Sequence, residues 1–235
     1  MAILQRYGDG CSASYAQPGL IREPRGHWAT SPVLLRTARG EPLRIVGLDY
    51  TGRVKRIAFA GRHYLIPFGV FDPAKHLSGL LVAEYVQGSA TAWAGKRVLE
   101  IGTGSGLIAG VLHDAGADVV ATDISRLAVE AARGNLAHTA VEVRRGDLFE
   151  PVAGESFDVI VVNPPYEIGR SLRPRYRSLN FLDRLASQWP RFARELCVAF
   201  PLDSGDVLAG CGFDVELVAT LTSPARALGI WGRSL

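Results

Sequence analysis

Residues 98–106, Val-Leu-Glu-Ile-Gly-Thr-Gly-Ser-Gly, decide the fold of this 235-residue chain. The first four residues end an apolar segment typical of a buried strand, and three glycines at alternate positions then turn the chain. Glycines in such a loop let a ligand approach the backbone and let the following helix pack on the sheet. The stretch therefore predicts a strand over 97–101, a ligand-binding loop, and a helix over about 105–115.

Apolar segments alternate in the same way along the rest of the chain. Helices are expected at 77–87, 126–136 and 204–212, and further strands at 118–123, 141–147, 157–162, 196–200, 214–221 and 227–231. Strands that alternate with helices imply right-handed crossovers and a mostly parallel sheet. The last two strands are expected to close the sheet as an antiparallel pair. The predicted fold class is α/β, with a mostly parallel seven-stranded sheet.

The segment before this sheet has a different pattern. Residues 1–30 are rich in glycine, proline, serine and alanine and are expected to form a loosely structured arm. Strands are expected at 43–48, 54–59 and 64–67, because turn signals separate these three apolar segments. We therefore expect a small antiparallel meander and two units: residues 1–70, acting as a lid or in substrate recognition, and residues 71–235, the main domain.

Composition excludes several classes of protein. Hydrophobic residues make up 48% of the chain, too many for a largely disordered protein. The net charge of +3, from 26 basic and 23 acidic residues, is too small for a polycationic nucleic-acid or membrane binder. The three cysteines lack CxxC spacing, no signal peptide or long apolar run is present, and no cluster has metal-ligand spacing. We expect a cytoplasmic protein without a metal or a membrane anchor.

Acidic residues mark the ends of successive predicted strands. Glu100 precedes the glycines, and Asp123 and Asp147 end the next two strands. Open α/β sheets bind ligands at this edge, where the Asp123 carboxylate could accept both hydroxyls of a ribose. Asp147, with the Leu148 amide, could contact an adenine edge. Leu107 occupies the place of the third glycine of a dinucleotide fingerprint, which disfavours NAD. The set resembles the S-adenosylmethionine site of class I methyltransferases.

The fourth strand of the domain ends in Asn163-Pro164-Pro165-Tyr166. Proline has no backbone N–H, so two in succession stop the strand and stiffen the loop. The Asn163 side chain and the Pro164 carbonyl are then two acceptors at a fixed separation. Such a pair can hold both hydrogens of an NH2 group and direct its lone pair at an electrophilic methyl. Tyr166 offers a face for a planar amide or base.

This motif resembles the signature of N-methyltransferases that act on amide or amine nitrogens, among them the HemK-type glutamine methyltransferases and the N6-adenine methyltransferases. Residues 59–73 are similar to the hairpin and Gly-Val-x-x-Pro entry of that family, and the resemblance covers about residues 55–235. It implies a Rossmann-like class I fold, a catalytic domain over 71–235, and S-adenosylmethionine as cofactor, with S-adenosylhomocysteine as product. It assigns the methyl-acceptor site to Asn163, Pro164 and Tyr166, and cofactor contacts to Glu100, Gly102, Thr103, Gly104, Asp123, Ile124, Asp147, Leu148 and Asn163.

The chain departs from that family in two places. Residues 74–78, Ala-Lys-His-Leu-Ser, lack the acidic residue followed by Thr or Ser that is common after the entry proline. The short arm replaces an N-terminal helical bundle, which makes a release factor a less favoured substrate. The expected acceptor is an amide or amine of a protein side chain or a small metabolite. A nucleic-acid base, or a non-catalytic cofactor-binding module, is the alternative. Further substrate contacts are predicted at His76, Arg170, Arg173 and Tyr176.

Overall fold

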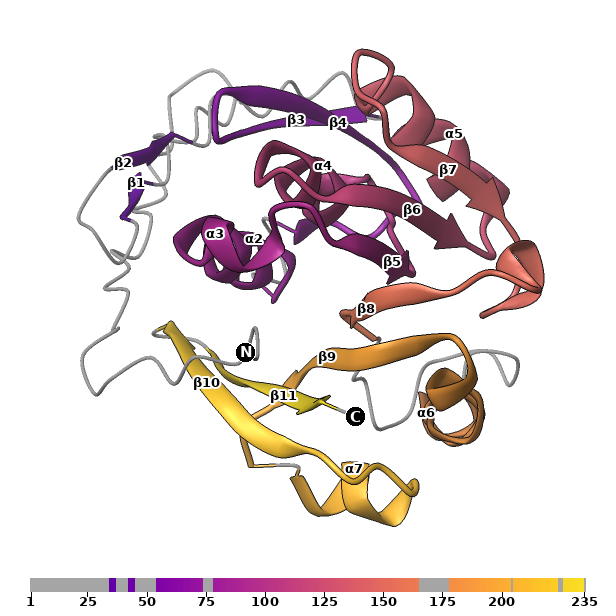
Figure 1. Cartoon of the computed structure of the whole chain (residues 1–235). Helices are drawn as coiled ribbons and strands as arrows, with labels where there is room; N and C mark the ends of the chain where they lie inside the picture. Colours follow the sequence, from indigo (N-terminus) through magenta and orange to yellow (C-terminus); the bar gives the residue numbers. More distant parts are fainter. Residues whose placement is uncertain are drawn as a thin grey trace.

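The computed structural model describes residues 34–36, 42–44, 54–73, 78–164, 178–203, 205–223 and 226–234. At its centre lies a seven-stranded sheet in the order β10-β11-β9-β8-β5-β6-β7 (Figure 1). Its strands are β5 (Arg97–Ile101), β6 (Asp118–Asp123), β7 (Glu142–Arg145), β8 (Phe157–Val162), β9 (Ala193–Pro201), β10 (Glu216–Ser223) and β11 (Arg226–Ser234). Strands β5 to β9 pair in parallel, and β11 joins β9 and β10 antiparallel. The predicted fold class and the closing antiparallel pair are confirmed.

Helices cover both faces of this sheet, so its central strands are apolar on both sides. Val98, Leu99, Ile160 and Val161 have no exposed surface. One face packs against α2 (Ser78–Gly88), α4 (Leu107–Asp114) and α5 (Arg126–Asn135), with the short α3 (Ala90–Trp93) beside α2. The other face packs against α6 (Ser178–Gln188), α7 (Gly205–Gly210) and two 3-10 turns, Glu150–Val152 and Trp189–Arg191.

A hairpin of β3 (Val54–Phe59) and β4 (Arg62–Pro67) packs on the α4 and α5 side of the sheet (Figure 1). Its inward residues are buried in the same core as the helices, and Arg62 pairs with Asp114 at the end of α4. On β4, the Leu65 N–H donates to Asn135 Oδ1 at 2.8 Å, and Asn135 Nδ2 donates to the Leu65 carbonyl at 2.9 Å. The same Nδ2 donates to the Ser105 carbonyl at 2.8 Å. Asn135 thus ties the hairpin to the glycine loop.

One prediction upstream of the seven-stranded sheet was wrong in detail, and one helix between β8 and β9 was not predicted. The described part of the strand expected at 43–48 belongs to β2 (Pro42–Arg44), and residues 45–48 lie outside the described residues. Strand β2 pairs with β1 (Leu34–Arg36), a strand the sequence did not indicate. The described residues therefore form two separate two-stranded sheets, β1–β2 and β3–β4, instead of one meander. Helix α6 was not predicted, although its apolar residues recur on one face, a spacing that is typical of a helix. Residues 1–33 lie outside the described part of the chain.

Within the described ranges, no helix combines the length and the apolar character needed to cross a membrane.

Candidate active site

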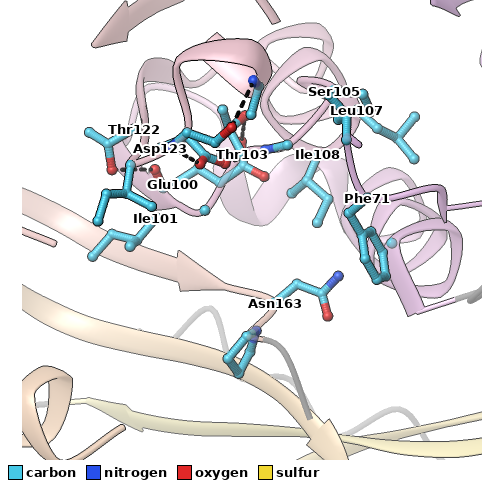
Figure 2. A pocket seen from close by; sticks show the side chains of 18 of the residues that line it. Phe71, Glu100, Ile101, Thr103, Ser105, Leu107, Ile108, Thr122, Asp123 and Asn163 are labelled. Carbon is cyan, nitrogen blue, oxygen red and sulfur yellow. Dashed lines mark hydrogen bonds between the residues drawn. The ribbon is translucent and has the colours of Figure 1, made fainter. Parts of the chain in front are cut away.

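A pocket of about 570 Å³ opens at the carboxyl ends of β5, β6, β7 and β8 (Figure 2). This volume falls within the range of small-molecule sites. The structure brings to it ten of the residues predicted from the sequence, which are Glu100, Gly102, Thr103, Gly104, Asp123, Ile124, Asp147, Leu148, Asn163 and Pro164. Tyr166, His76, Arg170, Arg173 and Tyr176, also predicted, lie outside the described residues.

The glycine loop has the backbone conformation that its sequence demands. Gly104 has φ +58° and Gly106 has φ +82°, in the left-handed region that side chains disfavour. A Cβ at Gly104 would meet no atom within 4 Å, so this stretch of backbone borders open space beside the pocket. A Cβ at Gly106 would come within 2.8 Å of Leu136 Cδ1. The first position thus leaves room for a ligand, and the second lets the loop pack against the end of α5.

Glu100 is buried, with 2% of its surface exposed. Its Oε2 accepts a hydrogen bond of 2.6 Å from the Thr103 hydroxyl, and its carboxylate also accepts from the Ala109 backbone in the first turn of α4. Burial raises the pKa of Glu100 to about 7. The carboxyl group therefore fixes the glycine loop to the start of α4 as well as lining the pocket.

Asp123 joins the glycine loop to the end of β6. Its Oδ2 accepts from the Gly104 N–H at 2.9 Å and its Oδ1 from the Ser125 N–H at 2.8 Å. Burial raises the pKa of Asp123, while these backbone donors act in the opposite direction. Each carboxylate oxygen has a second lone pair, so the group can still accept two hydroxyl hydrogens. This geometry fits a ribose diol.

Leu148 carries a strained backbone at the pocket, with φ +49° and 3% of its surface exposed. Residues with a side chain occupy this region at a cost of order 1–3 kcal/mol, and such outliers cluster at functional sites. No hydrogen-bond partner for its N–H is found among the described residues. A purine ring nitrogen would satisfy that donor. Beside it, Asp147 Oδ2 accepts from Arg184 Nη1 at 2.8 Å.

The opposite wall is built from distant segments. Asn163 follows β8 and lies across the pocket from the Glu100 and Thr103 loop, with Phe71 on its own side (Figure 2). Its Nδ2 donates to the hydroxyl of Ser78 at 3.4 Å, and Ser78 is fully buried at the start of α2. The amide nitrogen is therefore held by α2, and an amide oxygen, which has two lone pairs, can accept from a bound group.

Among the side chains of this pocket that sequence reasoning did not predict are Phe71, Phe181 and Arg184. Phe71 stands inside the Gly-Val-x-x-Pro entry and was not singled out. Phe181 and Arg184 are three residues apart on α6, so they share one helix face. The helical spacing of Leu182 and Leu185, both fully buried, is the signal that could have revealed α6.

No group of three or more metal-ligating side chains occurs in the part of the chain that the structure describes.

Comparison with known proteins identifies the family. The model of the methyltransferase small domain matches residues 76–178. A candidate protein N5-glutamine methyltransferase of Methanocaldococcus jannaschii is 34% identical over 155 residues, which cover 57% of this chain and 78% of that protein. The chain belongs to the HemK-type methyltransferase family. The cofactor of this family is S-adenosylmethionine, and the open loop, the Asp123 oxygens and the Leu148 amide fit that molecule.

Two other relatives of the HemK-type chain are longer. The ribosomal protein uL3 glutamine methyltransferase of Bradyrhizobium diazoefficiens is 34% identical over 48% of this chain and 39% of its own length. The release factor glutamine methyltransferase of Bordetella pertussis is 34% identical over 61% and 52%. The chain therefore spans about two fifths to one half of these relatives.

Solved structures share the fold of this HemK-type chain. A Thermus thermophilus 16S rRNA N2 G1207 methyltransferase, in complex with AdoMet and guanosine, has a TM-score of 0.55 and 20% identity, over 77% of this chain and 50% of its own. A Pyrococcus abyssi tRNA (uracil-54, C5)-methyltransferase, in complex with S-adenosylhomocysteine, has a TM-score of 0.55 and 17% identity, over 78% and 45%.

Proposed function

We propose that the chain methylates the side-chain amide nitrogen of a glutamine in a protein, with S-adenosylmethionine as methyl donor. The observation that carries the proposal is a single pocket that joins the acidic strand ends to the Asn163–Pro164 acceptor pair. The relatives named as glutamine methyltransferases support the choice of acceptor. Residues 71–235 would form the catalytic unit, and residues 1–70 would contribute to substrate recognition.

In the cofactor half of the pocket, hydrogen bonds within the protein would already hold the binding groups in place before the cofactor arrives. Asp123 would hold the ribose hydroxyls, and the Leu148 N–H, with Asp147, the adenine. When bound, the cofactor supplies a methyl group on a sulfonium, so that a carbon–nitrogen bond forms as the carbon–sulfur bond breaks. The glycine loop leaves its backbone accessible for the cofactor's methionine end.

The acceptor half would hold a planar NH2 group. Asn163 Oδ1 and the Pro164 carbonyl each accept one of its two hydrogens, which directs the nitrogen lone pair toward the methyl. Positioning of this kind supplies much of the rate acceleration in bimolecular reactions. The nitrogen gives up one hydrogen as a proton to solvent after transfer, so the mechanism requires no strong base among the pocket residues. The roles of Tyr166, His76, Arg170, Arg173 and Tyr176 stay predictions.

An exocyclic amino group of an RNA base is a second candidate acceptor. It presents the same planar NH2, and a ribosomal RNA small subunit methyltransferase C of Chromohalobacter salexigens is 40% identical over 81 residues, which cover 34% of this chain and 24% of that protein.

Tritiated S-adenosylmethionine distinguishes these acceptors. The chain is incubated with Bradyrhizobium diazoefficiens uL3, with a Bordetella pertussis release factor, and with 16S rRNA, and labelled products are located by mass spectrometry. Label on a glutamine supports the proposal, and label on RNA alone overturns it in favour of the second candidate. S-adenosylhomocysteine binding without label on any of the three overturns both in favour of a cofactor-binding module.

A further inference from the structure

Helix α6 contributes two side chains to the adenine end of the pocket. Phe181 and Arg184 stand three residues apart on one face of α6, and both line the pocket together with Asp147 and Leu148. The helix is anchored by Leu182 and Leu185, which are fully buried in the core on that side of the sheet. Arg184 is thus presented to Asp147 from a fixed helix.

The ion pair between Arg184 and Asp147 involves only one of the two carboxylate oxygens of Asp147. Arg184 Nη1 donates to Oδ2 at 2.8 Å, and no described residue donates to Oδ1. The side chains are 43% and 32% exposed, so the pair adds little to stability. The backbone of Asp147 is held separately, because its N–H donates to Glu150 Oε2 at 3.3 Å and its carbonyl accepts from the Glu150 N–H at 3.1 Å.

Orientation matters here because the terminal torsion of an aspartate is broad. An ionised carboxylate only accepts hydrogen bonds, whereas the 6-amino group of adenine donates them. A 6-oxo purine would set a carbonyl oxygen against the carboxylate instead. A carboxylate that is held in one orientation can distinguish the two purines, and a freely rotating one distinguishes them less well.

We propose that Arg184 is a positioning residue that fixes Asp147 so that its Oδ1 recognises the 6-amino group of the cofactor's adenine. The inference rests on the proposed function only in taking S-adenosylmethionine as the ligand. It adds a determinant of purine selectivity on a helix that follows the acceptor motif in the chain.

Calorimetric binding tests this role without any methyl acceptor. The ligands are S-adenosylhomocysteine and S-inosylhomocysteine, in which a 6-oxo group replaces the 6-amino group. The wild-type chain is expected to favour the amino ligand by about tenfold or more. Arg184→Ala should weaken binding of the amino ligand about fivefold and leave the affinity for the oxo ligand within about twofold. The ratio of the two affinities should therefore fall.

A double-mutant cycle separates orientation from general damage. In the Asp147→Asn background the charge that Arg184 pairs with is gone, so adding Arg184→Ala should change neither affinity by more than about twofold. Arg191→Ala is the matched control, because Arg191 is an exposed arginine just beyond α6 that does not line the pocket. Melting temperatures of all variants report on folding.

The outcomes separate cleanly. The proposal is supported if Arg184→Ala lowers the ratio of the affinities for S-adenosylhomocysteine and S-inosylhomocysteine, and if the same change leaves that ratio unaltered in the Asp147→Asn background. If Arg184→Ala weakens binding of both ligands equally, or changes neither affinity, the proposal is overturned and the cofactor assignment stands. A wild-type chain that binds neither ligand overturns the proposed function together with this inference.

Discussion

The two walls of the pocket are built in different ways. The cofactor wall comes from residues 100–148, where three successive strands deliver Glu100, Asp123 and Asp147 to one edge, and hydrogen bonds engage each carboxylate. The acceptor wall gathers Phe71, Pro73 and Gly79 with Asn163 and Pro164, and its described amide contact, from Asn163 to Ser78, is 3.4 Å long. The first wall is preorganised by the hydrogen bonds that its carboxylates accept, whereas the second depends on how α2 meets the end of β8.

The largest expected effect concerns the pH dependence of the cofactor wall. Burial raises the pKa of Glu100 to about 7 from an ordinary value of 4.5, so the folded state binds more protons than the unfolded state between these values. The contribution of Glu100 to stability is therefore present below pH 4.5 and is lost as the pH rises through 7. Relative to Glu100→Gln, the wild-type chain should lose about 3 kcal/mol of unfolding free energy between pH 4.5 and 8. Urea denaturation of both proteins across this range measures the difference, and a constant difference would contradict it.

The next prediction distinguishes the role of the acceptor wall in turnover from the role of the cofactor wall in binding. Asn163→Ala removes an acceptor for the target NH2 but leaves the cofactor wall intact, so kcat should fall about 100-fold while the dissociation constant of S-adenosylhomocysteine stays within about twofold. Turnover with labelled cofactor and calorimetry give the two numbers. Full activity in this variant would remove Asn163 from the mechanism.

The converse change acts on the other wall. Asp123→Ala removes both ribose-facing oxygens and the anchor of the Gly104 N–H, so S-adenosylhomocysteine should bind about tenfold more weakly. At saturating cofactor, kcat should recover to within about threefold of the wild type. Equal affinity in the variant and the wild type would mean that the ribose lies elsewhere. Asp203→Ala, which changes an exposed aspartate away from the pocket, is the control.

The smallest expected effect concerns the contact between Asn163 and Ser78 at the start of α2. Ser78→Ala removes the hydroxyl that accepts from Asn163 Nδ2, so this contact no longer favours one orientation of the amide over the other. We expect kcat to fall about threefold to fivefold with KM unchanged. In the Asn163→Asp background, whose carboxylate has no nitrogen end, the same change should cost less than about twofold. An equal loss in both backgrounds would indicate a general packing defect.

The same contrast explains what could be predicted from the sequence. The glycine loop and the acidic strand ends are contiguous motifs, so the parallel sheet and the residues of the cofactor wall follow from them. The partner of Asp147 is 37 residues away on a helix whose outer face is polar, and no local pattern indicates that contact. The expected meander failed for a related reason, because β2 pairs with β1, a three-residue strand with too few side chains to show a period.

The hydrogen bonds of Asn135 to Leu65 also protect the outer edge of the β3–β4 hairpin. The Asn135 side-chain amide gives Leu65 one acceptor and one donor, which is what the peptide group of a neighbouring strand would offer. Unpaired strand edges invite pairing with other chains, and natural proteins block them. Among the described residues, no strand pairs with this edge of β4, and a single side chain takes that place at its middle, so this position is closed to an invading chain. Replacing Asn135 with leucine would reopen it and favour self-association.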